Sequence, residues 1–103
     1  MFIAYGYAEL HLPYSHSLKE KRGIVHGVSE RIRKRFNVSL AEVDHHDLWQ
    51  RCRLGFSAVS YDITALEIIV KSIRESLDNY SDQLEVLDFE YRVNSYSRSD
   101  RLP

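Results

Sequence analysis

Hydrophobic and polar residues alternate along the first stretch of the chain. Small or apolar side chains occupy the even positions from Ala4 to Leu12, and more polar ones, among them Glu9 and His11, occupy odd positions between them. A period of two is typical of a β-strand, whose successive side chains point to opposite faces. Glu9 and His11 indicate which face points away from the core, and Pro13 ends the predicted strand.

A helix is predicted directly after this strand. The segment "SLKE" is a capping box, in which the Ser17 hydroxyl accepts from the amide of Glu20 and the Glu20 carboxylate reaches back to Ser17. Apolar residues then recur at helical spacing: Leu18, Val25, Val28 and Ile32. Asn37 marks the predicted end of this helix.

The remaining elements follow the same two periodicities. "NVSLAEV" (37–43) and "CRLGFSAVSY" (52–61) are predicted strands. "LEVLDFEYRV" (84–93) is a third, in which apolar and charged residues alternate from Leu87 to Val93. Between the last two, Asp62 can cap a helix that has one apolar face, and "DNYSD" (78–82) ends it with turn-forming residues.

The resulting order is strand, helix, strand, strand, helix, strand. It predicts an α+β, ferredoxin-like βαββαβ fold, with two helices on one face of a four-stranded antiparallel sheet and the first and third strands in its centre. We expect a single domain over residues 1–95 and a polar C-terminal tail over 96–103. The predicted core is Ala8, Leu10, Leu12, Val25, Val28, Ile32, Leu54, Phe56, Ala58, Leu66, Ile69, Ile73, Leu87 and Phe89.

Composition adds few constraints. The 103 residues are 44% hydrophobic and 28% charged with a net charge of −1, which is ordinary for one globular domain. A single cysteine excludes an internal disulfide and suits a reducing compartment. Glu9 interrupts the apolar opening run, and no basic segment precedes it, so neither a signal peptide nor a membrane span is predicted. We expect a cytoplasmic protein with no membrane partner and no cofactor.

Charge is nevertheless segregated along the chain. The segment 17–36 contains seven basic residues and only two acidic ones, Glu20 and Glu30. It therefore carries an excess of five positive charges in a chain whose net charge is −1. Such a helix favours contact with phosphates, and therefore with RNA or the ribosome. The alternative is a solvated helix face whose cations pair with neighbouring acids or complement the helix dipole. The candidate nucleic-acid-binding residues are Lys19, Lys21, Arg22, Arg31, Arg33, Lys34 and Arg35.

The predicted hairpin connection "AEVDHHDLWQRCR" (41–53) is rich in chemically versatile side chains. We interpret it as a partner-docking loop, since aspartates commonly cap turn amides and an anchored tryptophan with flanking arginines is frequent at binding hot spots. Its candidate residues are Asp44, His45, His46, Asp47, Trp49, Arg51 and Arg53. An alternative is a metal-assisted or acid–base site that also uses His11 and His16, although the spacing of these residues does not match a zinc-binding motif. Cys52 alternates with Leu54 and Phe56 and is predicted to be a core residue.

The sheet face opposite the helices would carry Tyr5, Tyr7 and His11 on the first strand, beside Arg51 and Arg53 on the third. Tyrosines beside arginines could stack bases as in RNA-recognition sheets. The same face could instead be covered by its own side chains or by a second copy in a homodimer. We favour covering or dimerisation, because the third strand has no outward aromatic residue.

Two long segments carry a resemblance to a known family. "LPYSHSLKEKR" (12–22) and "RFNVSLAEVDHHDLWQRCRLGFSAVSYD" (35–62) resemble the YlxP-like family, and the similarity extends over the chain except for its tail. The resemblance implies a small bacterial protein with a ferredoxin-like fold and no assigned function, of a kind encoded near translation-initiation and ribosome-maturation factors. The chain departs from the family pattern at Gly23, Gly27 and Tyr61. No catalytic residues can be carried over.

Three function hypotheses remain. The first is a non-catalytic bacterial protein that binds RNA or the translation machinery through the basic helix and the 44–53 loop. The second is a homodimerising interaction module without a nucleic-acid role. The third is a small enzyme that uses the histidines and aspartates of the hairpin.

Overall fold

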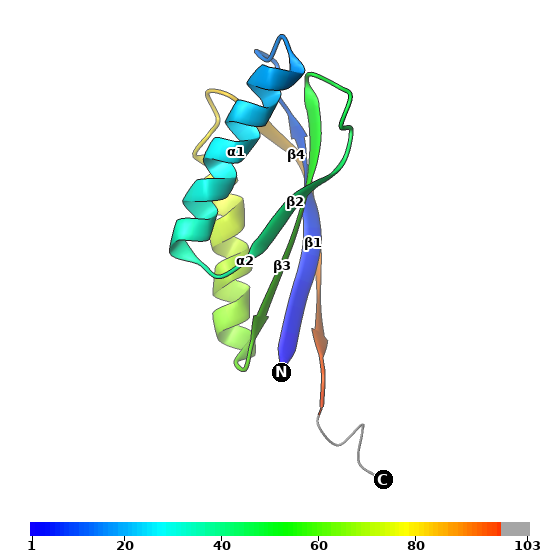
Figure 1. Ribbon diagram of the computed structural model, residues 1–103. Coiled ribbons are helices and arrows are strands. Elements are labelled where there is room, and N and C mark those ends of the chain that lie inside the picture. Colours follow the sequence, from blue (N-terminus) through cyan, green and yellow to red (C-terminus); the bar gives the residue numbers. More distant parts are fainter. Residues whose placement is uncertain (98–103) are drawn as a thin grey trace.

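The computed structural model describes residues 1–97, and the rest of the predicted tail (98–103) lies outside the described residues. The elements in chain order are β1 (Phe2–His11), α1 (Leu18–Arg35), β2 (Ser39–Asp44), β3 (Arg51–Ser60), α2 (Ile63–Asp78) and β4 (Glu85–Ser95). Both helices lie on the same side of one sheet (Figure 1). The predicted ferredoxin-like βαββαβ fold is confirmed.

The four strands form an antiparallel sheet in the order β2-β3-β1-β4, so β1 and β3 are central as predicted. β1 pairs with β3 along its whole length, from Phe2 opposite Ser60 to His11 opposite Arg51. β4 pairs with the other side of β1, and β4 and β2 are the two edge strands. This order brings residues from the two ends of the chain side by side, and the backbone amide of Tyr96 donates to the carbonyl of Met1.

The helix starts follow the predicted capping chemistry with one correction. The amide of Glu20 donates to the Ser17 hydroxyl at 3.1 Å, and the amide of Thr64 donates to the Asp62 carboxylate at 3.1 Å. The Glu20 carboxylate, however, accepts from the amide of His16 at 2.7 Å and not from Ser17. The bonds to Ser17 and Asp62 satisfy amides that the first turn of each helix leaves free, and the bond to Glu20 satisfies an amide just before α1.

The core lies between the sheet and the helices and contains most of the predicted residues. Val25, Ile69 and Phe89 are only partly buried and pack at its margin. Leu87 was predicted inside, which is wrong, since it is 49% exposed. A bulge shifts the β1–β4 register, so that Glu9 lies opposite Asp88 while Leu10 lies opposite Val86. The extra residue reverses the alternation, and Val86 replaces Leu87 on the core side.

Two further features concern the contact between β1 and β4 and the character of the helices. A Cβ atom at Gly6 would overlap the carbonyl oxygen of Glu90 and the Cα atom of Tyr91, so β1 and β4 approach closely there. Within residues 1–97, neither helix is both long and apolar enough to cross a membrane.

Candidate functional site

Lys21 of α1 is completely buried and holds the β2–β3 connection against the helix. Its ammonium lies 2.8 Å from the carbonyl oxygen of His45, 3.4 Å from that of His46 and 3.3 Å from that of Arg51. The carboxylate of Glu42 completes the shell at 2.8 Å. Burial of an ammonium is costly unless it is paired and hydrogen-bonded, and here both conditions are met. The expectation that Lys21 faces phosphate is therefore wrong.

Glu9 organises a second cluster on the opposite face of the sheet. Its carboxylate lies 2.5 Å from Nη2 of Arg51, 2.8 Å from Nε of Arg53 and 2.8 Å from Nε2 of His45. Burial by itself would raise the pKa of Glu9, but the hydrogen bonds from Arg53 and Arg51 and the interaction with His45 outweigh it and lower the pKa to about 2. The carboxylate is therefore an ion-pair centre and does not carry a proton near neutral pH.

The two clusters fix the 44–53 loop from both sides of the sheet. His45 adopts a left-handed backbone conformation, with φ of 66°, which points its carbonyl at Lys21 and its ring at Glu9. Asp44 accepts from the amide of His45 at 2.7 Å, an example of the predicted capping by aspartate. The amide of Leu12 donates to the carbonyl of Gln50 at 2.9 Å, which attaches the far end of the loop to the chain after β1.

Apart from Asp44, which accepts from the amide of His45, the predicted docking residues divide into two groups. His45, Arg51 and Arg53 point at Glu9 and belong to the internal support of the loop. His46, Asp47 and Trp49 are exposed, as is Leu48, which the sequence reasoning did not select. Trp49 and Leu48 expose 54% and 45% of their surfaces at the tip of this fixed loop.

Cys52 lies beside these clusters but is chemically inert. Its side chain is fully buried, as predicted. Burial chiefly, with the nearby Glu42 carboxylate, raises the pKa of its thiol to about 12. A thiol of this kind is neither a nucleophile nor a metal ligand at neutral pH.

The other cations of α1 remain at the surface. Arg33 lies 2.8 Å from the Glu30 carboxylate and donates to the carbonyl of Leu40 at 2.9 Å. In the part of the chain that the structure describes, five cations of this helix form no ion pair with an acid: Lys19, Arg22, Arg31, Lys34 and Arg35. Arg31 lies over the ring of Tyr80 and Arg35 over that of Phe36, at 5.5 and 5.4 Å.

The open sheet face is partly covered by its own side chains. The hydroxyl of Tyr7 lies 3.0 Å from the Glu90 carboxylate and 3.2 Å from that of Asp88, and the hydrogen bond to Glu90 is the main cause of the raised pKa of Tyr7. The guanidinium of Arg53 lies 4.3 Å from the centre of the Tyr7 ring. That ring face is therefore occupied, whereas Tyr5 is 40% exposed.

The histidines do not form one site. His11 lies 2.7 Å from the Glu85 carboxylate at the end of the sheet, whereas His45 faces Glu9. His16 is exposed before α1, and His46 is exposed on the loop. Among residues 1–97, no three histidine, cysteine or acidic side chains gather closely enough to hold a metal ion.

The ion pairs of Lys21 and Glu9 were not predicted, although the sequence holds a signal for each. Lys21 falls on the helical stripe of Val25, Val28 and Ile32, four residues before the first of them, which is an inward position. Arg51 and Arg53 stand two residues apart in a strand that the fold places beside Glu9. The signal for Lys21 lies in the helical spacing alone, whereas the signal for Glu9 depends on the register of β1 and β3.

The fold and the site together define a small ferredoxin-like α+β protein with a fixed hairpin loop and a cationic helix. Residues 3–91 match the family model described as "Protein of unknown function (DUF503)". Among curated proteins, the uncharacterized protein YlxP of Bacillus subtilis (strain 168) is 34% identical over 64 residues, which cover 62% of this chain and 70% of that protein. The chain belongs to this YlxP-like family, whose function is unassigned, so the resemblance noted from the sequence is confirmed.

Proposed function

We propose that this protein is a non-catalytic RNA-binding protein of the cytoplasm that works with the translation machinery. The observation that carries the proposal is the group of five α1 cations without an acidic partner among residues 1–97. Charges that the protein itself leaves unneutralised attract phosphates and release the counterions condensed on RNA.

These cations lie at both ends of the helix. Lys19 and Arg22 belong to its first two turns, and Arg31, Lys34 and Arg35 to its last two. At 1.5 Å per residue, the distance from Arg22 to Arg31 along the axis is about 14 Å. Nine residues at 3.6 per turn place the two side chains on opposite sides of the helix, so a strand that contacts both ends crosses the helix. A shallow hollow at the C-terminal end is lined by Arg33, Lys34 and Arg35 together with Phe36 to Val38.

The 44–53 loop supplies a second contact in this proposal. Lys21 binds the loop to the N-terminal half of α1, so Leu48 and Trp49 lie toward the same end of the molecule as Lys19 and Arg22. Exposed apolar side chains on a fixed backbone lose little conformational freedom on binding, which favours a protein contact beside the RNA.

The test is the salt dependence of binding to single-stranded RNA. We expect the affinity to fall as salt rises, and a variant with Arg31, Lys34 and Arg35 changed to Gln to bind more weakly and with a shallower slope, by roughly 0.7 for each phosphate that the variant no longer neutralises. Lys71→Gln, which removes an exposed cation from α2, is the matched control. Salt-independent binding, or an equally weakened control, would contradict the proposal.

The enzymatic alternative has less support. The histidine best placed for acid–base work, His45, is held by Glu9 and turned toward the sheet. The thiol of Cys52 is buried and protonated.

A further inference from the structure

The outer edge of β4 is the longest exposed backbone edge of the fold. β4 has 11 residues and only one neighbouring strand, β1. The other edge strand, β2, has 6 residues, and the guanidinium of Arg33 already occupies the carbonyl of Leu40 there. A long unpaired edge invites another strand, and natural proteins either block it or use it.

We propose that β4 pairs antiparallel with β4 of a second copy of this chain, about a two-fold axis at Tyr91, and that this edge forms a homodimer with one continuous eight-stranded sheet. In that register Tyr91 lies opposite its own copy and Glu90 lies opposite Arg92 of the second copy, twice by symmetry. Opposite positions in antiparallel strands share a face, so these charges meet directly.

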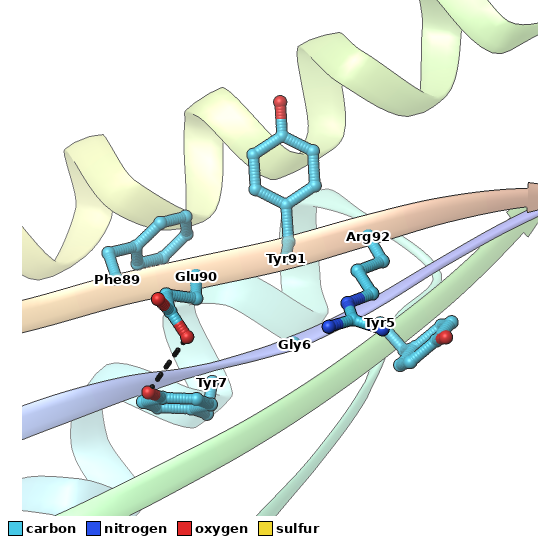
Figure 2. Close-up of a pocket in the computed structure, with 7 residues that line it drawn as sticks. All are labelled: Tyr5, Gly6, Tyr7, Phe89, Glu90, Tyr91 and Arg92. Carbon is cyan, nitrogen blue, oxygen red and sulfur yellow. Dashed lines mark hydrogen bonds between the residues drawn. The ribbon is translucent and has the colours of Figure 1, made fainter.

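The faces of the side chains agree with this pairing. Glu90 lies opposite Tyr7 and Arg92 opposite Tyr5, which places both charges on the open face of the sheet. Tyr91 lies opposite Gly6 and projects on the helix side, as Figure 2 shows. Phe89 and Val93 also lie on the helix side and would meet across the axis, next to the paired tyrosines.

Charge also selects the register. A shift that centres the pairing on Glu90 brings two glutamates together, and one that centres it on Arg92 brings two arginines together. Like charges directly opposite one another destabilise a strand pair. Centring on Glu90 would also set Asp88 opposite Arg92, but only the arrangement centred on Tyr91 gives both Glu90 and Arg92 an opposite charge and sets no like charges opposite one another.

A surface hollow of about 540 Å³ lies along this part of the edge, lined by residues 5–7 and 89–92 (Figure 2). Tyr91 is 46% exposed beside it, and the side chain of Arg92 forms no ion pair or hydrogen bond among the residues described. A second β4 would cover Tyr91 and bring Arg92 an acidic partner. Among the α1 cations, Arg22 lies on the β2 side of the helix, whereas Arg31 and Arg35 lie beside Ser76 and Asn79 at the end of α2.

The test is sedimentation of nuclease-treated protein over a range of micromolar concentrations. We expect the wild-type chain to reach twice its mass of 12.1 kDa. Glu90→Arg or Arg92→Glu alone should weaken the dimer by about tenfold, because two pairs per dimer become repulsive. The combined variant Glu90→Arg with Arg92→Glu should restore it.

Two controls separate this edge from other causes. Glu67→Arg reverses an exposed charge on α2, away from the outer edge of β4, and should leave the dimer intact. In a Tyr91→Cys variant, a short bismaleimide should cross-link two chains, whereas a Glu67→Cys variant on α2 should stay uncross-linked. The buried Cys52 does not interfere. A monomer throughout the range, or a dimer that ignores both single reversals, would overturn the inference.

Discussion

The ammonium of Lys21 in α1 lies 2.8 Å from the carboxylate of Glu42 in β2, and the lysine side chain has no exposed surface. This pair connects the basic helix to the hairpin, and the remaining hydrogens of the ammonium reach backbone carbonyls of the loop. Lys21 is therefore not a candidate for phosphate binding. Instead, it supports the loop whose tip is exposed.

Replacement of Lys21 should therefore lower the free energy of unfolding much more than replacement of the exposed Lys19. We expect Lys21→Met to lower the free energy of unfolding by roughly 3–5 kcal/mol, because it leaves the Glu42 carboxylate buried without a cation. Lys19→Met, at an exposed position in the first turn of the same helix, should change it by less than about 0.5 kcal/mol. Urea unfolding followed by circular dichroism measures both. Equal stability of the two variants would show that the buried pair does not support the loop.

Stability should depend on pH through Glu9. Its pKa in the folded protein, about 2, is below the ordinary value of 4.5. The folded state therefore binds fewer protons, so the stabilisation by Glu9 is fully present above about pH 4.5 and is lost as the pH falls toward 2. A Glu9→Gln variant should be less stable at pH 7 by about 1–3 kcal/mol and should lose less stability on acidification. Parallel acid dependences in the two proteins would contradict the ion-pair account.

Substitution by alanine should change the stability of the protein in opposite directions at Gly6 and Gly23. Gly6→Ala should destabilise the protein by several kcal/mol or prevent folding, because the new methyl group would overlap the backbone of β4. Gly23→Ala lies on the exposed side of α1, with nothing within 4 Å of the added atom, and should stabilise by about 0.5–1 kcal/mol. Thermal unfolding of both variants measures these changes. A Gly6→Ala variant as stable as the wild type would contradict the prediction, because it would mean that β1 and β4 can move apart at little cost in free energy.

Trp49 should matter for binding and little for folding. With 54% of its surface exposed, Trp49→Ala should change the free energy of unfolding by less than about 1 kcal/mol. Affinity capture from bacterial lysate, with and without ribonuclease, should show loss of a ribonuclease-resistant protein partner in this variant. Unchanged capture would remove the loop from the proposed function, and Tyr61→Ala, which alters a 92% exposed aromatic residue elsewhere, is the matched control.

The local periodicities were sufficient to predict the elements and, through them, the fold. Alternation in "LEVLDFEYRV" and the caps at Ser17 and Asp62 depend on neighbours a few residues away, which a sequence displays directly. The strand order then follows from two strand–helix–strand units. Of the seven α1 cations predicted to face phosphates, six lie at the surface and Lys21 does not.

Tertiary structure decided what depends on register between distant strands. The bulge opposite Glu9 and Leu10 exchanged Leu87 for Val86 in the core, because one extra residue reverses every side chain beyond it. The pairing of Glu9 with His45, and of Lys21 with Glu42, joins residues that are tens of positions apart in the chain. The helical spacing indicates an inward position for Lys21, but its partners, and the burial of the Glu9 carboxylate, are settled by what packs around them, which no local pattern along the sequence contains.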